Sequence, residues 1–176
     1  MFEIKYWSVF LIIVFLWIII RVINFLRKKE FSVKHEAKML LVLLGFVVIV
    51  RIVYFPWHHV NGEIGTLKFD GSRILPLWVN FLPIVHMFDS YDGWLMNIIG
   101  NITMFIPIGI FWPLCFKKLN SIEKSVLAGV GFPLFIEISQ LFFYERCTDI
   151  DDLLMNTTGY IIGTLIYFGV KKLRKL

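Results

Sequence analysis

The chain has 176 residues, of which 58% are hydrophobic, and its mean hydropathy is +0.75. Soluble domains are about 45–50% apolar, so this composition excludes an ordinary soluble enzyme and indicates a single-domain integral membrane protein. The net charge of +5 does not indicate nucleic-acid binding, because the basic residues stand between apolar runs, as in the positive-inside pattern of membrane proteins.

Five apolar segments are long enough to span a membrane as helices, since a helix needs about 20 apolar residues to cross a bilayer. The first two are predicted at residues 4–26 and 37–55. Residues 56–92 follow, polar at first and then apolar from 74 to 88, where prolines interrupt the run. We expect this stretch to be an extracellular segment, interfacial or re-entrant, packed over the helices. The other three helices are predicted at residues 93–116, 122–144 and 150–170.

Basic residues indicate the orientation of these helices. Clusters of lysine and arginine stand between the first and second helices, between the third and fourth, and in the tail. All lie on the cytoplasmic side only if the N-terminus is outside and the C-terminus inside, which five spans satisfy. We therefore predict an all-α, multi-pass plasma-membrane protein. Its parts are two N-terminal helices (1–55), the extracellular segment (56–92), a three-helix core with a polar pocket (93–170) and a cytoplasmic basic tail (171–176).

Polar side chains interrupt the last three helices at a similar predicted depth. Their spacings of i,i+3 and i,i+4 place the members of each pair on one helix face. With a rise of about 1.5 Å per residue, they lie roughly 10 Å below the outer boundary or nearer to it. A carboxylate or amide in hydrocarbon costs several kcal/mol without a partner, so such residues mark a site by default. The residues that line this predicted pocket, open to the outside, are Asn97, Asn101, Glu137, Gln140, Asp149, Asp152 and Asn156.

The same residues also have a purely structural interpretation. Amides and carboxylates between membrane helices can hold a bundle together by hydrogen bonds. Asp149 stands where the fifth helix needs an N-cap, and Asp152 follows three residues later, as in a capping box. Glu137 is the hardest to explain in this way, because a residue that only joins helices need not be ionisable. Gly159 and Gly163 form a small-xxx-small motif, which predicts close packing of the fifth helix.

Residues 73–170 contain an ordered series of motifs. The first three are Asn80-Phe-Leu-Pro-Ile84, Asn97-Ile-Ile-Gly-Asn101 and Phe105-Ile-Pro-Ile-Gly109. The next three are Glu137-Ile-Ser-Gln140, Thr148-Asp-Ile-Asp-Asp152 and Asn156-Thr-Thr-Gly159. In order and spacing the two sets resemble the first and second halves of the VanZ-like domain. Ile84 departs from the family pattern, which more often has phenylalanine there. Residues 1–55 carry no motif beyond hydrophobicity and charge.

The resemblance implies an association with resistance to glycopeptide antibiotics, notably teicoplanin and related lipoglycopeptides, in Gram-positive bacteria. It supplies no biochemical mechanism. We expect the pocket to engage a cell-envelope amphiphile, either a lipid-linked cell-wall intermediate or a lipoglycopeptide antibiotic, with membrane lipid as a further partner. Arg73 and Arg146 are expected to contact an anionic head group.

Two other classes of function stay open. One is a membrane enzyme acting on a lipid-linked cell-wall intermediate, with Glu137 or Asp152 as general acid or base. A divalent cation bound by Asp149 and Asp152 would favour this class. The other is a structural or partner-binding membrane subunit, in which alanine substitutions would reduce abundance and function together. The sequence contains no Ser-His-Asp, Cys-His, HExxH or P-loop arrangement, so we expect a binding protein without cofactor or metal.

Overall fold

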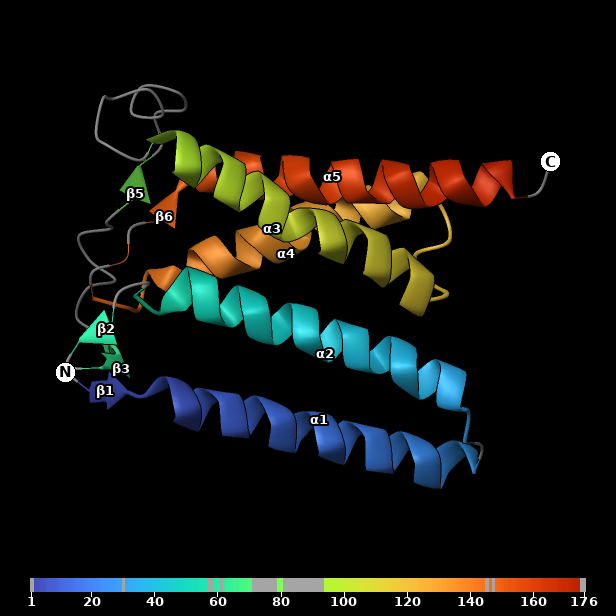
Figure 1. Cartoon of the computed structure of the whole chain (residues 1–176), viewed down its shortest axis with the longest axis horizontal. Helices are drawn as coiled ribbons and strands as arrows, with labels where there is room; N and C mark the ends of the chain where they lie inside the picture. Colours follow the sequence, from blue (N-terminus) through green and yellow to red (C-terminus); the bar gives the residue numbers. More distant parts are fainter. Residues whose placement is uncertain are drawn as a thin grey trace. The chain divides into compact units, whose positions relative to one another are not determined.

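Five helices and six short strands make up the part of the chain that the computed structural model describes, which is residues 2–29, 31–56, 59–60, 62–70, 79–80, 94–144, 146 and 148–174. In chain order (Figure 1) the elements are β1 (Phe2–Ile4), α1 (Tyr6–Lys28), α2 (Val33–Tyr54), β2 (His59–Val60), β3 (Glu63–Ile64), β4 (Leu67–Phe69), β5 (Val79–Asn80), α3 (Trp94–Cys115), α4 (Ile122–Gln140), β6 (Thr148–Asp149) and α5 (Ile150–Leu173).

The five helices confirm the all-α fold predicted from the apolar runs. Four of them, α1, α2, α3 and α5, are long and apolar enough to cross a membrane. The remaining helix, α4, has 19 residues and carries Glu123, Lys124 and Glu137. It ends at Gln140 rather than at Tyr144, because residues 141–144 form turns and a bridge to β4. The predicted interfacial run at 74–88 lies outside the described residues except for β5.

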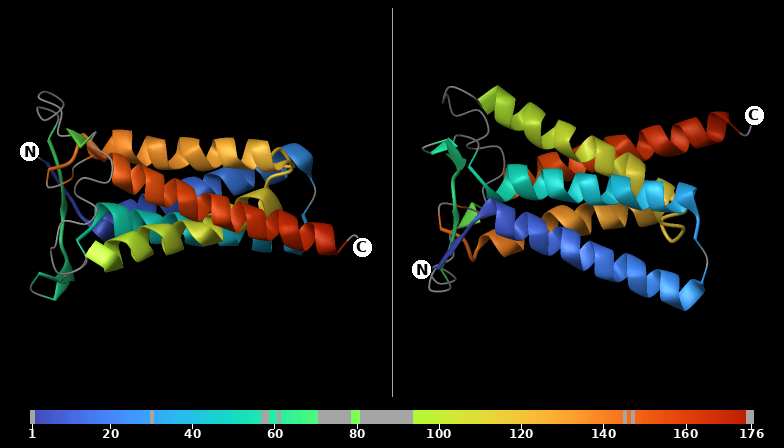
Figure 2. Two further views of the ribbon diagram at one scale, coloured as in Figure 1. Left: turned by 90° about the horizontal axis from the view of Figure 1, so that it is seen from above. Right: turned by 60° about the horizontal axis from the view of Figure 1, so that its bottom comes forward.

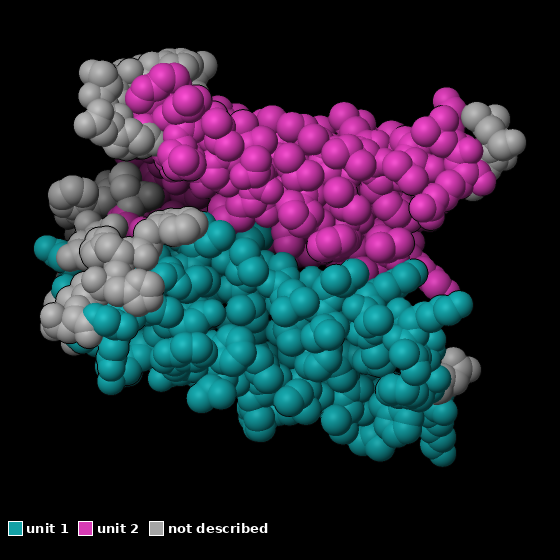
Figure 3. Space-filling model, in the orientation of Figure 1, with its two compact units in different colours: residues 1–71, 143–145 teal, residues 72–142, 146–176 magenta. Residues whose placement is uncertain are grey.

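The chain divides into two compact units, coloured separately in Figure 3. Unit 1 comprises residues 1–71 and 143–145, and unit 2 comprises residues 72–142 and 146–176. Unit 1 thus contains α1, α2 and the first four strands, together with a short piece of the connection between α4 and β6. Unit 2 contains α3, α4, α5, β5 and β6, and all of the described predicted site residues belong to it.

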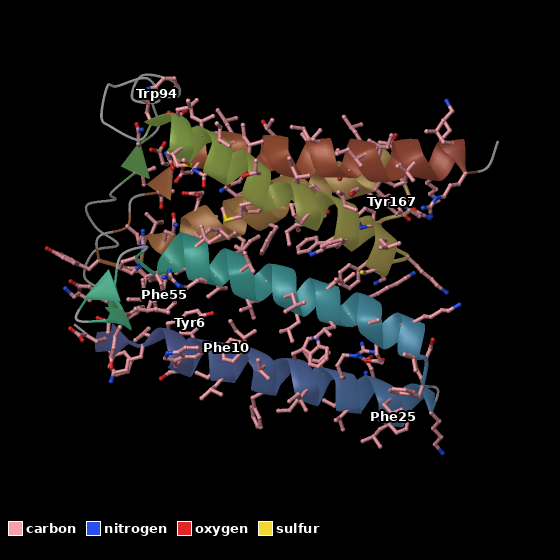
Figure 4. All side chains as sticks on the ribbon, in the orientation of Figure 1. Tyr6, Phe10, Phe25, Phe55, Trp94 and Tyr167 are labelled. Carbon is pink, nitrogen blue, oxygen red and sulfur yellow. The ribbon has the colours of Figure 1, made fainter. Side chains whose placement is uncertain are left out.

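Unit 1 is held together by backbone pairing and by contacts near the ends of its helices. β1 pairs antiparallel with β4, and the backbone N–H of Tyr144 donates to the carbonyl oxygen of Lys68 at 2.8 Å. The rings of Tyr6 and Phe55, labelled in Figure 4, meet edge to face with centroids 5.3 Å apart. No residue of α1 is buried within the protein, as expected for a helix that is apolar all round and surrounded by lipid.

In unit 2, α3 and α5 run beside each other at a separation that only glycine permits (Figure 2). A Cβ added to Gly159 would stand 2.0 Å from the carbonyl oxygen of Ile102. A Cβ on Gly163 would stand 2.1 Å from that of Ile106. The predicted close packing at these two glycines is therefore confirmed. Contacts of this kind, between the backbones of two helices, are a common means of association in membranes.

The core of unit 2 lies where all three of its helices meet. Tyr160 of α5 and Phe105 of α3 have no exposed surface, and the ring of Tyr160 lies over Gly129 of α4. The Trp112 ring packs edge to face on Tyr160, with centroids 5.8 Å apart. β5 and β6 pair in parallel where α5 begins, and we call this the strand end of unit 2 (Figure 1). The turn that joins α3 to α4 marks the opposite end, the turn end.

Candidate binding site at the start of α5

Asp149 is the N-cap of α5, which confirms one of its two predicted roles. Its backbone is extended, with φ −122° and ψ 125°, and its side chain accepts a hydrogen bond from the backbone N–H of Asp151 at 2.9 Å. The carboxylate also lies at the positive end of the helix dipole, where negative charge is stabilised. A polar, charged side chain is thereby fixed at the point where α5 enters the core of unit 2.

Glu137 reaches this cap from α4. Its side chain is only 2% exposed, and its Oε2 accepts a hydrogen bond from the backbone N–H of Asp149 at 3.0 Å. The carbonyl oxygen of Glu137 accepts a second bond from the Thr148 hydroxyl at 2.6 Å. In a capping box, the side chain at position N3 of the same helix accepts the hydrogen bond from the N-cap backbone N–H, and position N3 of α5 is Asp152. The capping-box interpretation of Asp152 is therefore wrong, because a residue of α4 binds the N-cap backbone instead.

Asp152 faces α3. Its Oδ1 accepts a hydrogen bond from the Asn101 Nδ2 at 2.8 Å. The same amide nitrogen lies 3.1 Å from the Oδ1 of Asn97, one turn earlier on α3 and exposed. Asn101 therefore connects α3 to α5 and also bonds to Asn97, so the two predicted pocket residues of α3 lie on the same face of that helix.

Asn80 is a site residue that the sequence reasoning did not select. β5 pairs with β6 so that Asn80 stands opposite Asp149, and its Nδ2 lies 3.2 and 3.3 Å from the two carboxylate oxygens of Asp149. The available signal was its place at the head of the motif Asn80-Phe-Leu-Pro-Ile84. Asp151 was also left out of the predicted set, although its carboxylate is buried within the first turn of α5.

The structure thus brings residues from five elements into two hydrogen-bonded groups at the start of α5, one around Asp149 and one around Asp152, which we together call the polar cluster. Its members are Asn80, Asn97, Asn101, Glu137, Asp149 and Asp152. Arg73 lies outside the described residues, and Arg146, just before β6, is partly buried. No group of three or more His, Cys, Asp or Glu side chains is arranged to hold a metal ion within the described ranges. The arrangement offers hydrogen-bond donors and acceptors rather than a cation cage.

Gln140 and Asn156 continue the polar faces of α4 and α5 beyond the cluster. Both are buried, at 5% and 2% exposure. The Oε1 of Gln140 and the Oδ1 of Asn156 make no hydrogen bond with any described residue. Buried polar atoms without a partner are rare and cost about 1–3 kcal/mol each. Among the predicted pocket residues that the structure describes, Gln140 and Asn156 are thus the two with an unpaired buried oxygen atom.

Comparison with known proteins gives two matches. The sequence model described as VanZ/LLP1 matches residues 8–172, which include α1 and α2. Protein VanZ of Enterococcus faecium is 34% identical over 71 residues, which cover 40% of this chain and 44% of that protein. The match therefore spans less than half the length of this relative. No solved structure gives a significant match.

Proposed function

We propose, on the premise that the chain belongs to the VanZ/LLP1 family, that this membrane protein binds a cell-envelope amphiphile and contributes to resistance against teicoplanin-type glycopeptides. The amphiphile is a lipid-linked cell-wall intermediate or the lipoglycopeptide itself. The protein crosses the plasma membrane of a Gram-positive bacterium several times, N-terminus outside and C-terminus inside. In that orientation the strand end of unit 2 faces the envelope.

One observation supports binding more than any other. The amide oxygens of Gln140 and Asn156 are buried without partners among the described residues, whereas the residues of the polar cluster take part in hydrogen bonds. The bonded groups hold α3, α4 and α5 in a fixed geometry, so the amides are positioned before a ligand arrives. Preorganised groups bind more tightly because less conformational freedom is lost.

The surface beside the cluster suits a ligand that is partly lipid. Asn97 is exposed on the first turn of α3, and Leu95, Met96 and Ile99 around it are exposed too. A polar head would bind at Asn97 and the cluster, while an acyl or isoprenoid chain would lie against these apolar side chains. Burial of apolar surface contributes about 25 cal/mol per Å², so the chain would supply much of the affinity.

The acceptors of the cluster limit which head groups fit. Glu137, Asp149 and Asp152 bring carboxyl groups to one place, and their oxygen atoms accept hydrogen bonds but offer no positive charge to a phosphate. Hydroxyl, amide and amino groups of a sugar or peptide head are therefore the complementary chemistry. A phosphate on the same molecule would need a cation, and Arg146 and Arg73 are the predicted candidates.

The test is direct binding of two probes to the full chain in lipid nanodiscs. The probes are teicoplanin and an isoprenoid-pyrophosphate disaccharide, and the variants are Asn97→Ala and Asn156→Leu. Thr103→Ala is the matched control, because Thr103 is exposed on α3 and its hydroxyl bonds only to its own helix. We expect severalfold weaker binding of one probe by both variants and unchanged binding by the control. Wild-type affinity in both variants would refute the proposal.

The structural alternative predicts a different result. The hydrogen bonds of the cluster run between residues of the protein, as they would if these residues only joined helices. In that case abundance in the membrane, teicoplanin resistance and thermal stability would fall together in every variant. Asn97→Ala separates the two interpretations, because Asn97 is exposed and its loss has little effect on packing. Weaker resistance at normal abundance would support binding.

A further inference from the structure

A line of polar residues runs from the polar cluster along α5 toward the turn end of unit 2. Asp152, Asn156, Tyr160 and Thr164 are spaced every four residues, so they share one face of the helix. A rise of about 1.5 Å per residue puts roughly 18 Å between the first and the last, more than half of a ~30 Å hydrocarbon layer. Asn156, Tyr160 and Thr164 are all buried.

α4 covers this face of α5 and continues the polar line. The hydroxyls of Ser125 and Thr164 lie 3.0 Å apart, and both residues are completely buried. Ser121 stands one turn before Ser125, at the N-cap of α4, where it is partly exposed. We call the set Ser121, Ser125, Thr164, Tyr160, Asn156 and Asp152 the polar track. It links a partly exposed serine at the turn end with the carboxylates at the strand end.

Two atoms of the track lack hydrogen-bond partners among the described residues. They are the hydroxyl of Tyr160 and the Oδ1 of Asn156. A dry interior would leave both atoms unsatisfied at a cost of about 1–3 kcal/mol each. Internal water molecules, which bridge such groups in many proteins, remove this cost.

We propose that water molecules bind to the unpartnered atoms of the polar track and connect its members, and that the track conducts protons through unit 2. Every member either has a hydroxyl, which accepts one proton as it releases another, or is an amide or carboxylate that binds water. A proton taken up at Glu137 or Asp152 would pass along water and the Tyr160, Thr164 and Ser125 hydroxyls to Ser121. No bond to carbon forms or breaks, and each proton that enters is matched by one that leaves. This inference shares Asn156 with the proposed binding site, where a bound molecule would displace the water, but it does not depend on the identity of any bound amphiphile.

Two tyrosines of α5 provide a matched test. Tyr160→Phe removes only the hydroxyl of the track, whereas Tyr167→Phe removes a hydroxyl at a partly exposed position outside it. The full chain is reconstituted in liposomes that contain a pH-sensitive dye, and a potassium gradient with valinomycin drives protons. We expect wild type and Tyr167→Phe to conduct severalfold faster than protein-free vesicles. Tyr160→Phe should fall to the protein-free rate.

Three further measurements test proton conduction by the track even if Tyr160→Phe changes the fold. Thr164→Val keeps the shape of the side chain, removes another hydroxyl and should also abolish conduction. Water-edited solid-state NMR should show rapid transfer from water to Tyr160, and slow transfer to the buried ring of Phe105. Replacement of external sodium by choline should leave the rate unchanged, since protons carry the current. Wild-type conduction at the protein-free rate, sodium dependence, or equally slow transfer to Tyr160 and Phe105 would overturn the proposal.

Discussion

The backbone N–H of Asp149 donates a hydrogen bond to the buried Oε2 of Glu137, over a distance of 3.0 Å. A side chain of α4 thus completes the N-cap of α5, and the first turn of one helix depends on the last turns of another. Loss of either partner should therefore affect both helices.

Glu137→Ala should destabilise unit 2 strongly, and Glu137→Gln should not. Alanine leaves the partly buried Asp149 N–H without its Glu137 acceptor, which costs up to about 1–3 kcal/mol, whereas the glutamine carbonyl oxygen can still accept the bond. Thermal unfolding of the purified protein in detergent measures the difference. Glu123→Gln, an exposed change in the first turn of α4, is the control and should cost no more than about 0.3–1 kcal/mol, the usual effect of one charge at a helix N-terminus. Equal losses for alanine and glutamine would contradict this account of the cap.

Asp149→Ala should cost about 0.5–2 kcal/mol, the usual effect of removing an N-cap side chain. Asp149→Asn should lose less, because the amide oxygen still accepts from the Asp151 N–H. The asparagine variant also keeps an acceptor for Asn80, which bonds to Asp149 from β5. The same unfolding measurement applies. A serine variant as unstable as the alanine variant would show that capping is not what Asp149 contributes, since serine is an equally good cap.

Gly159→Ala should disrupt the packing of α3 on α5. The added Cβ would stand 2.0 Å from the Ile102 carbonyl oxygen, so the helices must separate, and overpacking typically costs about 1–3 kcal/mol. Gly169→Ala is the matched control on the same helix, with open space around its Cβ. It should be neutral, or stabilising by up to ~1 kcal/mol through helix propensity. Folded yield after detergent extraction distinguishes them, and equal yields would argue against the close approach.

Asn101 and Asp152 should be energetically coupled across α3 and α5. Their side chains are 2.8 Å apart, and contacting residues show interaction energies of about 0.5–3 kcal/mol. A double-mutant cycle of Asn101→Ala and Asp152→Ala measures this energy by thermal unfolding. The reference cycle pairs Asp152→Ala with Thr103→Ala, whose hydroxyl bonds to its own helix. The prediction fails if both cycles give the same additive result.

Local patterns were enough to predict the helices, the cap at Asp149 and the close packing at Gly159 and Gly163. Each of these depends on residues within a few positions of one another. The end of α4 was misjudged, because Leu141, Phe142 and Phe143 continue its apolar pattern although the chain turns there. Only the bridge between Phe143 and Phe69 shows why the helix stops.

The missed part of the site depends on contacts between distant segments. Asn80 meets Asp149 through pairing of two-residue strands that are 69 positions apart, for which the sequence has no local signal. The backbone N–H of Asp149 bonds to Glu137 rather than to Asp152, because the packing of the helices places α4 beside the start of α5. Tyr160 stands in an apolar run and reads as an ordinary core residue, so its unpartnered hydroxyl was not foreseeable.

The short piece at residues 143–145 has a consequence for how this chain can be cut. It belongs to unit 1 although it lies between α4 and β6, so the polypeptide passes from one unit to the other three times. A gene fragment that begins after residue 71 would lack Lys68 and Phe69, the partners of Tyr144 and Phe143. The connection between α4 and β6, which leads to Thr148 and the N-cap of α5, would then lack its backbone contacts with β4. We expect the shortest piece of this protein that still folds to contain both units, and the family match over residues 8–172 likewise includes helices of both.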